Sequence, residues 1–370
     1  MSNRTRVSFG MACTVLTLAI VSLGAPQRAL AQEEKEGNTQ DGVIRSQVDL
    51  VSVYFTVRDG KKQLASELEQ SRFKVFEDGK EQPIKFFAHH SDVVLNVGML
   101  LDTGTNMAWM LGEEAQASGM FLKHVVRPTD LGFILTYASR VETLQVPTSD
   151  TALLAKKADS IRNWGTAVGT PDQAPPPPPR GIPGTTGPFP PSSRPGTSGD
   201  AYSRREAHLY DALRVSTLRY LSREVGRKAV VVVALSGDAR SESSLEEALE
   251  VLLQNDVIAY VLQIYDPPRE RSRYDRCDVI HTYEHDSSGE QVLKKMAEAT
   301  GGRMLEVHGM DKLEEALDEI SNELHHQYSL GYYPENRNWD GKFRKIQIAA
   351  EGGGYKVFAR KGYYGNPRGR

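Results

Sequence analysis

Continuous apolar runs, separated by amphipathic stretches, dominate the middle of the chain. The runs cover residues 93–101, 131–138, 229–235, 257–264 and 304–307. Strands that are buried on both faces of a parallel sheet have such unbroken runs, and the stretches between them have helical periodicity. This alternation of strand and helix predicts an α/β domain with a doubly wound, mainly parallel sheet.

Two of the helical stretches have sequence signals at their ends. A helix is expected over 245–252, and Ser243 with Glu246 three residues later predicts a capping box at its start. A second helix, over 292–297, is expected to end at Gly301, because a glycine readily adopts the left-handed conformation that closes a helix.

The regions on either side of this domain alternate between apolar and polar residues, which is typical of half-buried strands. Alternation is seen over 48–57 before the domain, and over 328–333, 343–349 and 355–361 after it. Each region is too short to bury a core by itself, so the N-terminal and C-terminal strands are expected to pair. The sequence therefore predicts a small discontinuous β-rich unit attached to the α/β domain.

The start of the chain has the three parts of a secretory signal. Arg4 and Arg6 precede an apolar run over 11–23, and Ala31 ends an Ala-Leu-Ala cleavage motif. The apolar run is shorter than the roughly 20 residues that a bilayer-spanning helix needs. We therefore expect export to the periplasm or the cell surface, with the signal removed and no stable membrane span left.

The expected organisation has five parts and one insertion. These are a signal peptide (1–31), a flexible leader (32–46), an N-terminal β-rich unit (47–90), the α/β domain (91–326) and a C-terminal β extension (327–366). Residues 165–204 are rich in Pro and Gly and are expected to form a disordered insertion, because they cannot bury enough apolar surface to fold.

Charge and cysteine content exclude some classes of protein. The net charge of −3 becomes −6 when the signal, with three arginines and no acid, is removed. Binding of nucleic acid needs clustered Lys and Arg, so a nucleic-acid partner is not expected. Cys277 is the one cysteine left, so the mature chain cannot form an intramolecular disulfide, and a role in pairing between chains stays open.

Polar residues follow two of the central runs, at the points where those strands end. In a doubly wound sheet, ligands bind beyond the carboxyl ends of the strands, where the strand order reverses. The predicted ligand-binding face consists of Asp102, Thr103, Thr105, Ser236 and Asp238. Such oxygen ligands suit a hard cation such as Mg²⁺. The alternative is that Asp102 caps a helix that starts near Met107.

Several motifs identify a family resemblance that covers nearly the whole mature chain. They are FKVFEDG at 73–79, VGMLLD at 97–102, LYDAL at 209–213, GRKA at 226–229, ATGGR at 299–303, YSLGYYP at 328–334 and KGYY at 361–364. Together they resemble the von Willebrand factor A domains, and in particular the VWFA-related family of acidobacterial exported proteins. The resemblance implies a Rossmann-like A-domain fold and a protein-binding, adhesion-type role.

The resemblance also implies a metal-ion-dependent adhesion site, which this chain keeps only in part. Asp102 matches the first aspartate, but Gly104 and Asn106 stand at the two serine positions. Ala207 stands at the threonine position and Gly237 at that of the late aspartate. The site is therefore degenerate, and a bound Mg²⁺ or other divalent cation is only weakly indicated. The remaining candidate metal ligands are Asp102, Asn106 and Asp238.

One string of residues suggests an enzyme. His281, Glu284 and His285 have the H-x-x-E-H order that inverted zinc peptidases place on a helix. Prolines before the string and a Ser-Ser-Gly after it indicate a loop, so a chance match is favoured. No catalytic residues are predicted. Two functions remain, a protein-binding module and a structural envelope scaffold without metal dependence, with a zinc peptidase as a remote alternative.

Overall fold

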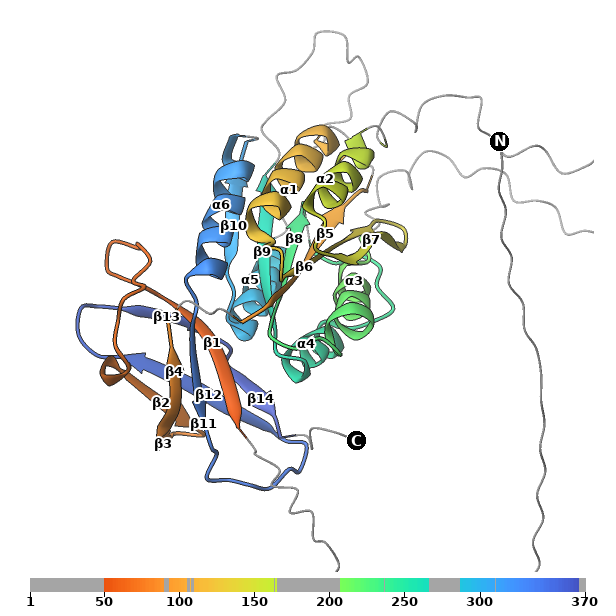
Figure 1. Cartoon of the computed structure of the whole chain (residues 1–370). Helices are drawn as coiled ribbons and strands as arrows, with labels where there is room; N and C mark the ends of the chain where they lie inside the picture. The colour runs from red at the N-terminus through yellow and green to blue at the C-terminus, as the bar shows by residue number, and fades with distance from the viewer. Residues whose placement is uncertain are drawn as a thin grey trace, which may run out of the picture. The chain divides into compact units, whose positions relative to one another are not determined.

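The computed structural model describes residues 50–89, 93–104, 107, 110–162, 164, 207–235, 237–265, 287–309 and 311–365. The expected signal peptide, leader and insertion, and Cys277, lie outside these residues. Residues Val48–Arg370 form one compact unit, which contains two β-sheets of four strands and one sheet of six (Figure 1).

The six-stranded sheet has the long apolar runs of the sequence at its centre. Its strands are β5 (Leu95–Asp102), β6 (Leu131–Tyr137), β7 (Val141–Thr148), β8 (Arg227–Ala234), β9 (Val257–Tyr265) and β10 (Met304–His308). They lie in the order β10-β9-β8-β5-β6-β7, and every neighbouring pair is parallel except β6 and β7. By chain order within the sheet this is 3-2-1-4-5-6 read from β7, the order of a doubly wound fold. The predicted fold class is confirmed.

Helices cover both faces of this sheet. One face carries α1 (Leu111–Val125), α2 (Thr151–Asp159) and α6 (Asp311–His325), and the other carries α3 (Leu209–Val215), α4 (Leu245–Gln254) and α5 (Ser287–Thr300). A short π-helix, η6 (Ser216–Leu221), continues α3. Successive side chains of a strand point to opposite faces, which explains why β5 is buried along its whole length.

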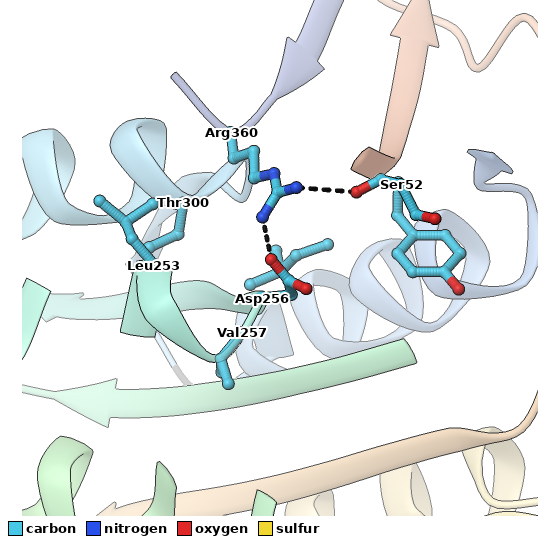
Figure 2. A pocket seen from close by; sticks show the side chains of 8 residues that line it. Ser52, Leu253, Asp256, Val257, Thr300 and Arg360 are labelled. Atoms are coloured by element: carbon cyan, nitrogen blue, oxygen red, sulfur yellow. Dashed lines mark hydrogen bonds and ion pairs between the residues drawn. The ribbon is translucent and has the colours of Figure 1, made fainter. Parts of the chain in front are cut away.

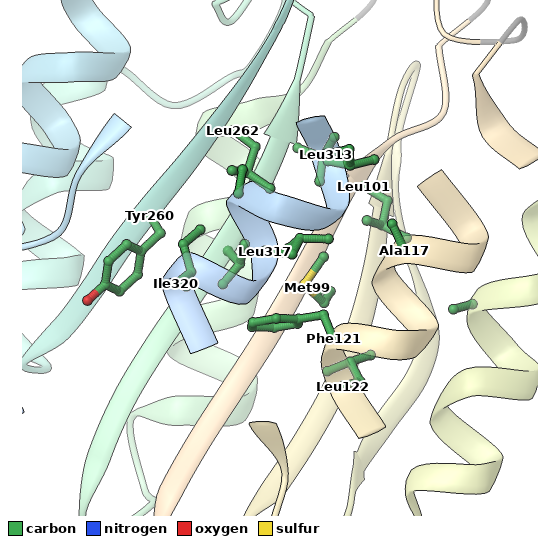
Figure 3. Packing of buried hydrophobic residues seen from close by; sticks show 14 of the residues in the cluster. Met99, Leu101, Ala117, Phe121, Leu122, Tyr260, Leu262, Leu313, Leu317 and Ile320 are labelled. Atoms are coloured by element: carbon green, nitrogen blue, oxygen red, sulfur yellow. The ribbon is translucent and has the colours of Figure 1, made fainter. Parts of the chain in front are cut away.

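The packing of the first face is seen in Figure 3. Met99 and Leu101 of β5 lie against Phe121 of α1 and Leu317 of α6, while the intervening Leu100 belongs to the core on the other face. Burial of an aliphatic or aromatic side chain contributes about 1.5–3 kcal/mol. Both cores meet in the central strands β5 and β8, so the ends of these two strands are held firmly in place.

The flanking strands form the discontinuous β unit that the sequence predicts. One sheet has the order β13-β1-β11-β4 and the other β14-β12-β2-β3. The strands are β1 (Val51–Arg58), β2 (Phe73–Glu77), β3 (Lys80–Gln82), β4 (Ile84–Ala88), β11 (Tyr328–Tyr332), β12 (Phe343–Ala350), β13 (Lys356–Ala359) and β14 (Gly362–Tyr364), with a short 3-10 helix, η1 (Gln70–Arg72), before β2. In the first sheet N-terminal and C-terminal strands alternate, and in the second two C-terminal strands lie beside two N-terminal strands. The two parts of the chain meet in pairs such as Val51↔Tyr332 and Val75↔Ile348.

Two local predictions are corrected. The capping box of α4 is formed by Ser244 and Glu247, one residue later than predicted from Ser243 and Glu246. The reason is tertiary, because the Ser243 backbone N–H donates to Asp211 and is held in the preceding loop. Helix α1 begins at Leu111 and not near Met107, and its N-cap residue makes no side-chain cap bond.

The part of the chain that the structure describes contains no helix that is both long and apolar enough to cross a membrane.

Candidate functional site

Asp102 is the last residue of β5, the strand next to β8 at which the strand order reverses. Its Oδ1 accepts a hydrogen bond from the Gly104 N–H at 2.9 Å, and its carboxyl also accepts from the Leu235 N–H. The residue is 5% exposed, and burial raises the pKa of its carboxyl to about 6 in spite of these two bonds. Asp102 therefore holds its own turn and does not cap α1.

Glu114 in the first turn of α1 is a second buried acid, which the sequence analysis missed. The residue has no exposed surface, and neither of its carboxyl oxygens has a hydrogen-bond partner among the described residues. Burial, and then the charge of Asp102, raise the pKa of Glu114 well above its ordinary value. The sequence did contain a sign of this burial, because Glu114 lies three residues after Leu111, on the face of α1 that is buried.

Asp238 has a structural role that the sequence did not predict. Its Oδ1 accepts from the Tyr210 N–H at 3.0 Å and from the Ser241 hydroxyl at 2.5 Å, and its Oδ2 accepts from the Ser241 N–H at 3.0 Å. Both oxygens are therefore occupied in joining the start of α3 to the loop after β8.

The positions where the adhesion site would have its threonine and late aspartate are filled by close packing. Gly237 is buried, and a Cβ at this position would lie 3.0 Å from the Gly289 Cα at the start of α5. Ala207 is 4% exposed, and its carbonyl oxygen accepts from the N–H groups of Ala239 and Arg240. The threonine and late-aspartate ligands of the adhesion site are thus missing here, since neither Ala207 nor Gly237 has a side-chain oxygen and Gly237 has little room for one.

The other predicted site residues are divided between described and undescribed positions. Thr103 is half-buried and its N–H donates to the Tyr137 carbonyl at 3.0 Å. Thr105, Asn106 and Ser236 lie outside the described residues, as does the whole string His281, Glu284 and His285. Within the described ranges, no three His, Cys, Asp or Glu side chains are grouped so that they could hold a metal ion.

The carboxyl ends of β9 and β10 add an aromatic pair to the same face, which the sequence analysis did not single out. Tyr265 and His308 are opposite in register, and their rings stack with centroids 4.3 Å apart. Burial, followed by the charges of Glu290 and Glu306, raises the pKa of Tyr265 to about 12, so its hydroxyl keeps its proton. The His308 side chain is 63% exposed. This pair therefore presents a ring to solvent at the carboxyl end of the sheet, with β8 between it and β5.

A pocket on the other side of the domain is a structural junction (Figure 2). Arg360, after β13, forms an ion pair with Asp256 before β9 and donates to the Ser52 carbonyl of β1 at 2.8 Å. The free volume of the pocket is about 10 Å³, which is room for about one water molecule. The pocket joins the β unit to the α/β domain and is too small for a ligand.

Comparisons with known proteins give similarity in structure only. No protein-family model matches the sequence, and no curated protein sequence matches it. Among solved structures, BatB of Bacteroides thetaiotaomicron is 15% identical with a TM-score of 0.39, over 62% of this chain and 97% of that chain. A von Willebrand factor type A protein of Catenulispora acidiphila is 9% identical with a TM-score of 0.41, and the match covers 86% of this chain and 74% of that chain.

A third similar structure is proximal thread matrix protein 1 of the mussel byssus, with a zinc-occupied MIDAS motif. It is 12% identical with a TM-score of 0.39, and the match covers 64% of this chain and 49% of that protein, about half its length. Likeness at this level carries no argument about binding. The strand order and the two helical layers show, by themselves, that the chain has a doubly wound α/β fold with an added discontinuous β unit.

Proposed function

We propose that this chain is an exported, non-enzymatic protein-binding module of the VWFA-related type, which meets its partner through the carboxyl-end face of the six-stranded sheet. The observation that supports this most is the position of Asp102, at the strand end where the order of the sheet reverses. Ligands of doubly wound folds bind at such switch points. The exposed ring of His308 extends the same face toward β10.

The binding does not use the adhesion site of the family in its usual form. Gly237 and Ala207 stand where the adhesion site has its late aspartate and threonine ligands. The carboxyl of Asp238 accepts hydrogen bonds from Tyr210 and Ser241. The partner contacts are therefore made by the protein face itself, with hydrogen bonds from the loops and apolar contact with the rings.

A photo-crosslinking experiment tests this proposal. A photoreactive amino acid is placed at Arg240 or His308, which are exposed on the carboxyl-end face, and in a control at Val225, which is 79% exposed at the amino end of β8. We expect one protein to be captured in the native envelope from the first two positions and not from the third. Capture from Val225 alone, or capture of different proteins from each position, would contradict the proposed face.

One observation favours the second candidate function, a structural scaffold that makes its contact through the β unit. Strand β4 is an edge strand that pairs only with β11 among the described strands, and Phe86 on it is 54% exposed. Edge strands with exposed apolar side chains are sites at which another chain can add a strand. A photoreactive group at Phe86 separates the two functions, because the scaffold requires capture there and not at His308.

The absence of enzyme activity is part of the proposal and has its own test. A zinc peptidase would need His281 and His285 to bind zinc with Glu284 as general base. We expect purified protein to contain no stoichiometric zinc by elemental analysis. Zinc at one equivalent that is lost in H281A, together with cleavage of a casein substrate, would show that the chain is an enzyme.

A further inference from the structure

The stacked rings of Tyr265 and His308 form an open aromatic pair at the ends of β9 and β10. The two residues are opposite in register, and their ring planes differ by 17°. Among the described strands, β10 is the outermost strand of its sheet, so no further strand of that sheet covers the pair. The His308 side chain is mostly exposed. A flat aromatic surface is therefore accessible at this edge of the carboxyl-end face.

A carboxylate stands beside the aromatic pair. Glu306 precedes His308 by two residues on β10, so the two side chains lie on the same face of the strand. The Glu306 Oε2 lies 3.4 Å from the His308 Nε2, and Glu306 forms no other ion pair in the described part of the chain. Its side chain is 54% exposed. The carboxylate is therefore accessible to a cation from outside the chain.

A buried hydrogen-bond acceptor lies in the layer below the rings. Gln263 is opposite Glu306 in register and two residues before Tyr265, so its side chain is on the same face of the sheet. Its Nε2 donates to the Leu235 carbonyl at 2.6 Å, whereas its buried Oε1 has no hydrogen-bond partner among the described residues. A carboxylate, an amide oxygen and ring faces are thus gathered at one place, and each of them attracts a cation.

Given the proposed function, we propose that the aromatic pair and Glu306 receive an arginine side chain of the protein partner. A guanidinium is planar, so it can lie on the His308 ring while its N–H groups bond to the Glu306 carboxylate. A lysine ammonium is a compact point charge and has no plane to lie on a ring. An acidic side chain would be repelled by Glu306, and an apolar one would leave this carboxylate without a counter-charge. The chemistry of the site therefore favours arginine.

The test is an NMR titration of the protein without its expected signal peptide, in which the backbone amide signals of β9 and β10 are followed. The probe is the peptide acetyl-Gly-Arg-Gly-amide, and acetyl-Gly-Lys-Gly-amide has the same charge without the planar group. We expect the arginine peptide to shift these signals with a dissociation constant of about 1–30 mM. The lysine peptide should bind at least about twofold more weakly, because it cannot stack.

Four variants assign the binding to this site. E306Q removes the charge and H308A removes the ring, so each should weaken the arginine peptide at least about threefold. H308F keeps a ring and should restore most of the binding that H308A loses. The matched control is E113Q, which removes an exposed acid in the first turn of α1, at the same end of the domain, and should bind as the wild type does. Glu306 and His308 are exposed, so their variants should melt as the wild type does.

Three results would overturn the proposal. They are equal binding of the two peptides, equal binding by E306Q and the wild type, and the lack of a saturable shift in β9 and β10. Shifts that grow with protein concentration in the absence of peptide would show that a second copy of the chain fills the site, and would also contradict it.

The peptide titration does not require the protein partner, so this proposal and the proposed function can fail separately. If the photo-crosslinks from Arg240 and His308 capture a partner while the arginine peptide does not bind, the proposed function stands and the arginine site does not. If the peptide binds at this site and no partner is captured at the carboxyl-end face, the arginine site stands and the proposed function does not.

Discussion

Replacement of Asp102 by Asn should stabilise the protein at neutral pH, although it alters the residue at the centre of the candidate site. The pKa of the carboxyl is about 6 in the folded chain, against 3.8 for an ordinary aspartate. The unfolded chain therefore releases this proton first as the pH rises, which stabilises the unfolded state between these two pH values. At 1.36 kcal/mol for each pH unit of difference, the cost is about 3 kcal/mol above pH 6.

The sign of the effect follows from the raised pKa. Well below pH 3.8 the carboxyl is protonated in both states and costs nothing, and well above pH 6 the full cost is present. Asn has no proton to release and its side-chain oxygen can still accept from the Gly104 N–H. The difference in unfolding free energy between D102N and the wild type should therefore grow from near zero at low pH to as much as about 3 kcal/mol in favour of D102N at pH 7.

Urea denaturation in EDTA, at several pH values from 4 to 8, measures this difference directly. The control is E113Q, which replaces an exposed acid of α1 and should show no comparable growth of the difference with pH. The reasoning would be refuted if D102N were less stable than the wild type by the same amount at every pH, because the carboxyl would then act only as a hydrogen-bond acceptor.

Two other substitutions test the packing that holds the site. G302A should cost more than about 3 kcal/mol or prevent folding, because its Cβ would lie directly against the Ala259 carbonyl oxygen, while G60A meets nothing within 4 Å and should be neutral in thermal unfolding. R360M should lower the unfolding free energy by about 2 kcal/mol in urea, because it removes the ion pair with Asp256 and the hydrogen bond to the Ser52 carbonyl at the junction. An unchanged R360M would show that the junction is not stabilised by this pair.

The main features of the fold could be predicted because they depend on patterns that are local in the sequence. The apolar runs of β5, β8 and β9 are unbroken, since these strands are covered on both faces. Strand β7 was not predicted. Its residues are nearly all half-buried, with Pro147 near its end, so it has neither a continuous apolar run nor a clear alternation. Its place at the edge of the sheet explains this pattern.

The start of α4 shows where local patterns become ambiguous. Ser243 with Glu246 and Ser244 with Glu247 have the same spacing, so the sequence permits two capping boxes. The bond from the Ser243 N–H to Asp211 decides between them, and this contact joins residues 32 positions apart. Such a choice depends on tertiary structure and cannot be read from the helix alone.

The place of Asp102 at a strand end could be predicted from the sequence, and the side chains that surround it only in part. Asp102 could be placed because it follows an apolar strand of the doubly wound pattern. Glu114 was missed because it stands next to the exposed Glu113, and a pair of acids in a first helical turn is ordinarily solvated. The approach of Gly237 to Gly289 joins distant segments, so no pattern within either one predicts it.

The most direct test of the proposed function is the affinity of the captured partner for variants of each end of the α/β domain. Calorimetry would compare the wild type with a double variant at the carboxyl-end face, R240E with H308D, and with V225S at the opposite end, each with and without EDTA. We predict that the double variant binds at least about tenfold more weakly, a loss of 1.4 kcal/mol or more, and that V225S binds as the wild type does. Equal binding by the double variant, or a loss confined to V225S, would contradict the assignment of the binding face.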